Sequence, residues 1–211
     1  YSSLVDLIEH GFREHASRNA YAYMDRFFTF GEIDRYSAAF ASWLQSQGLA
    51  KGARVAIMMP NVVQYPIALA GVLRAGFVVV NVNPLYTPRE LEHQLKDSGA
   101  EAIVILENFA ATLQQVIART AIKKVVVASL GEMLGFPKSA IVNFAVRRLK
   151  KMVPGYMLPG HVKFTETLDA GARRKLEPIA ATQRDIAFLP YTGGTTGVSK
   201  GAALTHGNLV A

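Results

Sequence analysis

The chain of 211 residues is 50% hydrophobic and 18% charged, a composition typical of a folded protein with one large core or two smaller ones. Its net charge at pH 7 is +7 and it contains no cysteine, which excludes disulfide bonds and cysteine-ligated metals and favours a reducing compartment. The sequence has no run of about 20 apolar residues for a membrane-spanning helix and no signal-peptide layout at its N-terminus, so we expect a soluble, cytoplasmic protein.

The opening segment predicts two helices joined by a β-hairpin. Ser3 is a suitable cap for the first helix, because the apolar residues that follow it have helical spacing. Residues 20–29 are rich in Tyr and Phe around a central Asp-Arg pair, which indicates a short hairpin. Thr29 and Glu32 then have the spacing of a capping box, and we expect the second helix to end at Gly48.

From residue 53 onwards, buried strands and helices alternate. The predicted strands are residues 54–59, 77–82, 102–106 and 124–128. The predicted helices run from an Asn61 cap to Ala75, from a capping box at Thr87 and Glu90 to Ser98, and over about 109–120. Such alternation implies right-handed βαβ crossovers and a parallel sheet. The expected fold class is therefore α/β, with mostly parallel sheets flanked by helices.

Basic residues are concentrated between positions 138 and 175. This segment contains nine Lys or Arg against two acidic residues, a surplus equal to the net charge of the whole chain. Within it, residues 139–153 place apolar side chains along one face of a predicted helix. The basic residues beside that face are Arg147, Arg148, Lys150 and Lys151. Such a helix can lie on an anionic membrane, although a surface helix docked on the core is the commoner arrangement. Nucleic acid is not expected as a partner, since no aromatic residues are interleaved with this charge.

A glycine- and threonine-rich stretch lies between two predicted strands, residues 185–189 and 201–204. It consists of Tyr191, Thr192, Gly193, Gly194, Thr195, Thr196, Gly197, Val198, Ser199, Lys200 and Gly201. The glycines permit positive φ angles and leave backbone amides open to an anion. The hydroxyls and the Lys200 ammonium add hydrogen-bond donors and positive charge. Ligands of α/β sheets lie beyond the C-terminal ends of the strands, so we predict a phosphate-binding loop here.

The spacing of this stretch excludes two well-known phosphate loops. A Walker loop requires Gly-Lys-Ser/Thr, whereas Lys200 lies between Ser199 and Gly201. A dinucleotide-binding fingerprint requires G-x-G-x-x-G at the start of a helix, whereas here a threonine pair follows two adjacent glycines. The remaining structural alternative is a plain flexible turn, because Gly, Ser and Thr are common in loops.

The stretch from Leu189 to Lys200, with the Gly-Ala-Ala-Leu-Thr-His-Gly-Asn that follows it, resembles the AMP-binding signature of the adenylate-forming superfamily. Within that superfamily it is most similar to long-chain-fatty-acid–CoA ligases. Further matches lie upstream at residues 59–66, 73–91 and 97–100. The resemblance covers nearly the whole chain and is weakest near 130–175. Many members have a proline where this sequence has Ser199, a difference that alters loop stiffness and not the set of donors.

The resemblance implies that residues 1–211 are the N-terminal portion of the AMP-binding large domain of a longer enzyme. The predicted parts are a helix, hairpin and helix (1–52), βα repeats (53–128), a basic helical insertion (129–180), and a strand, phosphate loop, strand and helix start (181–211). The family's adenine, ribose and magnesium elements, and a lysine on a C-terminal domain, would lie downstream. We therefore expect this fragment to be inactive alone.

By the same resemblance, the full-length parent is expected to activate a long-chain fatty acid with ATP as an acyl-adenylate and transfer it to coenzyme A. Residues 191–201 would bind the β and γ phosphates, with Lys200 as the catalytic cation and Mg²⁺ brought by ATP. One alternative is a medium-chain or aryl acid–CoA ligase of the same superfamily. Another, of a different class, is a module that binds the anionic inner face of a membrane through residues 139–153.

No protein-bound metal is predicted. The five histidines are His10, His15, His93, His161 and His206. They show no ligand spacing, and scattered histidines are usually surface residues. His206 lies nearest to the loop but is given no catalytic role, since Thr205 beside it is predicted to cap a final helix.

Overall fold

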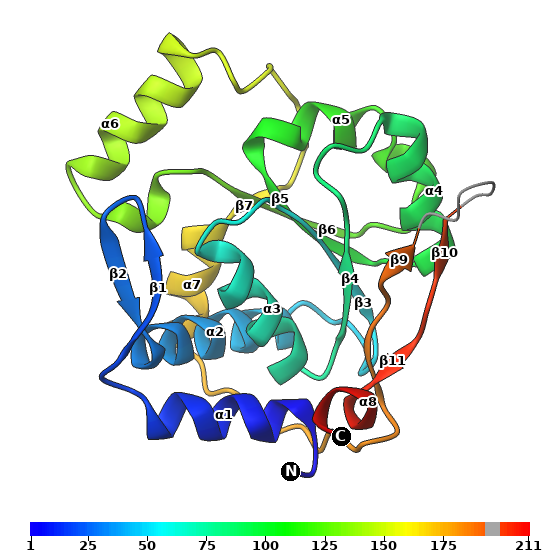
Figure 1. Ribbon diagram of the computed structural model, residues 1–211. Coiled ribbons are helices and arrows are strands. Elements are labelled where there is room, and N and C mark those ends of the chain that lie inside the picture. Colours follow the sequence, from blue (N-terminus) through cyan, green and yellow to red (C-terminus); the bar gives the residue numbers. More distant parts are fainter. Residues whose placement is uncertain (193–198) are drawn as a thin grey trace.

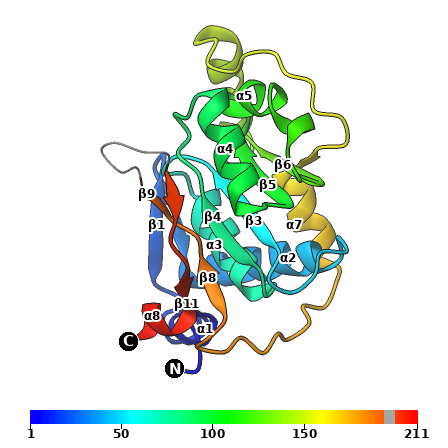
Figure 2. The same ribbon diagram turned by 90° about the vertical axis from the view of Figure 1, so that its right-hand side faces the viewer.

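The computed structural model describes residues 1–192 and 199–211 (Figures 1 and 2). Its centre is a seven-stranded sheet with the strand order β11-β8-β4-β3-β5-β6-β7. The strands are β3 (Arg54–Met58), β4 (Val78–Asn81), β5 (Ala102–Leu106), β6 (Lys124–Ala128), β7 (Val162–Lys163), β8 (Ile186–Phe188) and β11 (Leu204–Thr205). Neighbouring strands are parallel except for β11 and β8, which confirms the predicted α/β class.

Helices cover both faces of this sheet (Figure 1). The helices of the first face are α1 (Leu4–Glu14), α2 (Phe30–Gln45), α3 (Gln64–Arg74) and α7 (Phe164–Ala172). They share a core with Val55 and Ile57 of β3. On the other face, α4 (Pro88–Ser98) and α5 (Ala110–Gln114) pack against Ala56 and Met58. Both faces of the central strands are therefore buried, which explains why these strands are continuously apolar in sequence.

Local capping contacts confirm several predicted helix boundaries. Ser3 caps α1 by accepting a hydrogen bond from a first-turn amide. Thr29 caps α2 and Thr87 caps α4, each in a reciprocal capping box with the glutamate three residues later. Thr205 caps α8 (His206–Val210) in the same way with an asparagine. Gly99 ends α4 in the left-handed conformation, with a φ of 62°, which glycine adopts without steric cost.

The predicted hairpin is present as the antiparallel pair β1 (Asn19–Tyr23) and β2 (Arg26–Thr29). Its turn residues are Met24 and Asp25, with φ angles of 46° and 59°. Two positive φ angles are the mark of a hairpin turn whose twist matches that of its strands. The turn therefore lies one residue before the Asp-Arg pair on which the sequence pattern was centred.

Two predicted helices of the βα region were wrong in their boundaries. Asn61 does not cap α3, which begins at Gln64 without a side-chain cap, because the amide of Val62 bonds the carbonyl of Pro60 in a separate turn. The helix expected over 109–120 is the five-residue α5 followed by a 3₁₀ turn, Ile117–Arg119. β-branched residues on either side of the break lower the helix propensity there.

The basic helix also differs from its prediction. α6 (Lys138–Phe144) continues as a π-helical segment, Ala145–Leu149, and the chain then leaves the helix at Lys151, whose φ is 49°. Of the predicted apolar face, Val146 is buried, whereas Ile141 is 64% and Leu149 is 71% exposed. The helix is therefore docked along one edge only, and Figure 1 shows it standing out from the body of the protein.

The strand expected over residues 201–204 was wrong as a single element. It is divided between β10 (Lys200–Gly201), which pairs with β9 (Tyr191–Thr192), and β11 of the large sheet. None of the described helices is long and apolar enough to cross a membrane.

The sequence pattern predicted neither β7 nor α7, which both lie within the segment 129–180. β7 extends the sheet beside β6. α7 packs against α2 at very close range, since a Cβ on Gly171 would lie 1.8 Å from the carbonyl oxygen of Ala39. Gly171 is therefore required by helix packing.

Candidate phosphate-binding site

The predicted phosphate loop begins at the C-terminal edge of the parallel sheet. β8 pairs with β4, and the amide of Leu189 continues this pairing to the carbonyl of Val79 at 2.9 Å. The chain then passes directly into β9 (Figure 2). This is the edge at which open α/β sheets bind their ligands, and it agrees with the placement predicted from the sequence.

The two described ends of the loop lie side by side in an antiparallel pair. Thr192 is opposite Lys200 and Tyr191 is opposite Gly201. The amide of Ala202 also donates to the carbonyl of Pro190 at 2.9 Å. Six of the predicted residues, Gly193, Gly194, Thr195, Thr196, Gly197 and Val198, lie outside the described residues.

Tyr191 attaches β9 to helix α4. Its hydroxyl donates a hydrogen bond of 2.6 Å to the carboxylate of Asp97, and its ring covers Gly201, where an added Cβ would lie 3.0 Å from ring carbons. Burial, followed by the neighbouring Asp97, raises the pKa of Tyr191. The hydroxyl therefore remains protonated and able to donate at neutral pH.

His93 attaches the other end of the loop to the same helix. Its Nε2 lies 3.1 Å from the carbonyl oxygen of Ser199. Because a carbonyl oxygen can only accept a hydrogen bond, the contact requires the tautomer of His93 that carries a hydrogen on Nε2. His93 and Asp97 are four residues apart on α4 and so lie on one face of it. The sequence pattern predicts only a surface position for His93. The available signal was this spacing, which places both polar groups on one face of α4; the hydrogen bonds to Ser199 and Tyr191 show that this face is turned towards the two ends of the loop.

Lys200, the last residue but one of the predicted loop, is exposed. Among residues 1–192 and 199–211, no carboxylate lies within 4.0 Å of its ammonium group. An ammonium group with no carboxylate partner among the described residues, at the end of a glycine- and threonine-rich stretch of sequence, is suited to an anionic ligand. The described part of the chain also contains no group of three or more His, Asp or Glu side chains that could hold a metal ion.

The sheet edge beside the loop is held from both faces at Asn81, the last residue of β4. Tyr65 of α3 donates its hydroxyl to the Asn81 side chain at 2.9 Å. Gln94 of α4 donates its side-chain amide to the Asn81 carbonyl at 2.8 Å. Neither residue was predicted as part of the site, because each depends on how a helix packs on the sheet. Together they restrict movement of the strand on which β8 is paired.

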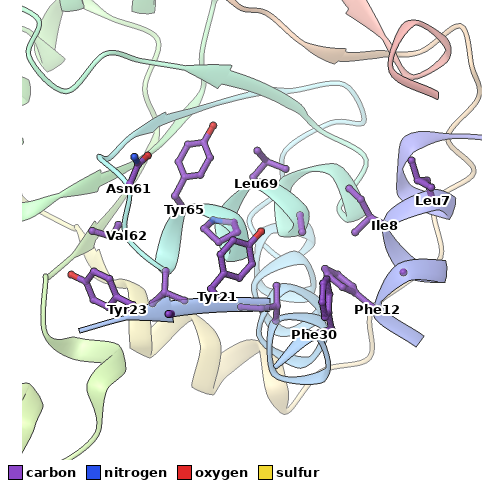
Figure 3. Close-up of a pocket in the computed structure, with 16 residues that line it drawn as sticks. Leu7, Ile8, Phe12, Tyr21, Tyr23, Phe30, Asn61, Val62, Tyr65 and Leu69 are labelled. Atoms are coloured by element: carbon purple, nitrogen blue, oxygen red, sulfur yellow. The ribbon is translucent and has the colours of Figure 1, made fainter. Parts of the chain in front are cut away.

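A separate apolar pocket of about 630 Å³ lies between α1, β1 and α3 (Figure 3). The labelled side chains that line it are Leu7, Ile8, Phe12, Tyr21, Tyr23, Phe30, Asn61, Val62, Tyr65 and Leu69. Tyr65 stands at the end nearest to the C-terminal edge of the sheet, where it bonds Asn81. Apolar pockets of this size accept hydrocarbon groups.

The mostly parallel α/β sheet, with a glycine- and threonine-rich stretch of sequence at its C-terminal edge, places the chain in the class of α/β proteins that bind ligands, nucleotides among them, at this edge. The chain belongs to the AMP-binding enzyme family, whose sequence profile matches residues 8–211. The family and the fold class predicted from the sequence are confirmed by this match, whereas the phosphate-binding role of residues 191–201 stays a prediction.

Individual relatives are similar over the whole chain. It is 52% identical over 211 residues to a long-chain-fatty-acid–CoA ligase of Haemophilus influenzae, covering 100% of this chain and 38% of the relative. An anthranilate CoA ligase, AuaEII, solved with anthranoyl-AMP, has a TM-score of 0.78 at 20% identity, covering 98% of this chain and 35% of that one. A long-chain-fatty-acid–CoA ligase of Archaeoglobus fulgidus has a TM-score of 0.71 at 25% identity, covering 97% and 37%. The chain thus spans less than two fifths of these relatives.

Proposed function

We propose that the full-length protein is an ATP-dependent long-chain-fatty-acid–CoA ligase to which this chain contributes the phosphate loop. The reaction would produce acyl-CoA, AMP and pyrophosphate through an acyl-adenylate. The observation that carries the proposal is the 52% identity over every residue to a relative of that name. The position of the loop ends at the C-terminal edge of the sheet supports it.

In this proposal, the fatty acid carboxylate attacks the α-phosphate of ATP, and pyrophosphate leaves. Negative charge grows on the leaving group, so a cation placed there stabilises the transition state more than the ground state. Lys200 is the cation that this chain supplies. The Mg²⁺ that accompanies ATP would neutralise further phosphate charge. Tyr191 and His93 hold the two ends of the loop against α4, which keeps the donors in place before the reaction begins.

The two half-reactions test this proposal. The full-length protein, given oleate and ATP with Mg²⁺, should release pyrophosphate, and addition of coenzyme A should then release AMP. Residues 1–211 alone should show neither activity, because relatives of this name are more than twice as long. Absence of pyrophosphate release by the full-length protein with any acid would refute the assignment.

Acid profiling separates the long-chain assignment from a medium-chain or aryl acid ligase. The apolar pocket of Figure 3 is lined mainly by apolar side chains of the described residues and therefore suits a hydrocarbon chain. Leu69→Trp adds bulk to this pocket and should lower kcat/KM for long acids more than for short ones. An equal loss of kcat/KM for all acids would instead indicate that the pocket is filled by another part of the full-length protein and does not hold the acyl chain.

A second proposed property is peripheral contact with the inner face of an anionic membrane. The segment 136–157 exposes several large apolar side chains: Phe136, Ile141, Phe144, Leu149, Met152 and Met157. Phe136 is 90% exposed, and the basic residues Arg148, Lys150 and Lys151 lie close by in sequence. Exposed apolar residues flanked by positive charge are the signature of an interfacial helix.

Charge reversal of Arg148, Lys150 and Lys151 to Glu tests this contact by co-sedimentation with anionic vesicles. Arg147 should be left intact, since it forms hydrogen bonds of 3.0 Å with the buried Glu107. Binding should fall in the variant and should weaken in the wild type as salt rises. Unchanged binding would mean that this is an ordinary surface helix docked on the core, without a role at a membrane.

A further inference from the structure

A second pocket of about 570 Å³ lies between α6 and the start of α7, at the ends of β6 and β7. We call it the basic pocket and define it by Ser139, Asn143, Arg147, Arg148, Lys163 and Thr165. Its place is the same C-terminal edge of the sheet that carries the phosphate loop. It lies at the opposite end of the strand order, because β6 and β7 are separated from β8 by β4, β3 and β5.

The charges around the basic pocket do not cancel. Arg147 is neutralised by Glu107, with Nη2 and Oε2 2.8 Å apart. Arg148 has no carboxylate within 4.0 Å among residues 1–192 and 199–211. The nearest carboxylate to Lys163 is that of Glu166, 3.6 Å away in a solvent-exposed ion pair. Exposed ion pairs are weak, so Lys163 can exchange this partner for an anionic ligand.

One carboxyl group, that of Glu132, also lines the basic pocket. Burial raises the pKa of Glu132 to about 7. A hydrogen bond of 3.1 Å donated by the Gln64 side chain acts in the opposite direction and offsets only part of this rise. Near neutral pH this group is therefore protonated in a large share of molecules. The net charge that a ligand meets is positive.

The uncharged groups of the basic pocket also suit an anion. The N-terminus of the nine-residue helix α7 lies at the pocket, since Lys163 precedes its first residue and Thr165 is in its first turn. Helix N-termini favour anions through the backbone dipole. The hydroxyls of Ser139 and Thr165 add donors from opposite walls.

We propose that the basic pocket binds a phosphate group, with Arg148 and Lys163 as its charged partners. The two candidate sources of this phosphate group both follow from the proposed function, on which the inference therefore rests. One is the phosphate groups of coenzyme A, the second polyanionic substrate. The other is the headgroup of a phospholipid, because Phe144 and Arg148 of the same helix line the pocket and are exposed to solvent.

The test uses the full-length protein with the double variant Arg148→Gln, Lys163→Gln. The matched control is Lys150→Gln, Lys151→Gln, which removes the same charge from the same region outside the basic pocket. The first arm measures KM for coenzyme A and for 3′-dephospho-coenzyme A, starting from preformed oleoyl-adenylate. The second arm compares binding to vesicles containing phosphatidic acid or phosphatidylglycerol at equal surface charge. Urea unfolding midpoints verify that all variants are folded.

A rise of about tenfold or more in KM for coenzyme A in the pocket variant, without a change in the control, identifies coenzyme A as the source. Loss of a preference for phosphatidic acid, again confined to the pocket variant, identifies a lipid headgroup. If neither quantity differs between the pocket variant and the control, the proposal is overturned. Adenylation, measured separately, should be unaffected. If the wild-type protein showed no adenylation at all, the proposed function would be refuted. The vesicle-binding experiment would still test the basic pocket in that case, because it does not depend on adenylation.

Discussion

Tyr191→Phe removes one hydroxyl from the site and leaves the ring over Gly201 unchanged. The lost interaction is the 2.6 Å hydrogen bond to Asp97. Hydrogen bonds to charged groups contribute about 1.5–3 kcal/mol, and because Asp97 is exposed we take about 1 kcal/mol after solvent screening. That free energy corresponds to roughly a fivefold change in an equilibrium constant.

The expected result is a rise of about fivefold in KM for ATP in the adenylation half-reaction, with a smaller effect on transfer from preformed acyl-adenylate. Pyrophosphate release by the full-length protein measures the first step. Tyr86→Phe is the matched control, since the Tyr86 hydroxyl has no hydrogen-bond partner among the described residues. An unchanged KM for ATP, or an equal effect of both substitutions, would refute the role given to α4 in holding the loop.

Three other substitutions give distinct expected outcomes. Lys200→Ala should lower the adenylation rate by an amount equivalent to roughly 2–4 kcal/mol, with Lys200→Arg recovering part of it; equal loss in both half-reactions would argue against a phosphate role. Gly171→Ala should destabilise the chain by about 1–3 kcal/mol in urea unfolding, because its Cβ would meet the Ala39 carbonyl at 1.8 Å, whereas an unchanged midpoint would mean that the two helices separate freely. Glu132→Gln should remove a pH dependence of the free energy of unfolding. Burial raises the pKa of Glu132 from 4.5 to about 7. The stability that the protonated Glu132 contributes is therefore fully present below pH 4.5 and is lost as the pH rises through 7. The variant should therefore gain roughly 2–3 kcal/mol over the wild type between about pH 4 and about pH 8, and parallel stability curves would contradict this.

Short-range chemistry explains what the sequence determined by itself. The caps at Ser3, Thr29 and Thr87 depend on groups three residues apart, and Gly99 depends on its own φ angle. The central strands are recognised by continuous apolar runs that only a doubly covered parallel sheet requires. The phosphate loop could be proposed from the sequence for the same reason, because its donors and glycines are consecutive in the chain; its role stays a prediction.

The tertiary structure alone decided which distant groups meet. His93 and Asp97 reach Ser199 and Tyr191 across 106 and 94 positions of sequence, and no local pattern encodes such contacts. The same holds for α7, whose place is set by the close approach of Gly171 to α2. The exposed apolar side of α6 also follows from docking along a single edge, since periodicity indicates that a helix has an apolar face and not whether protein covers it. Burial and partner choice are properties of packing, so they appear only once the chain is folded.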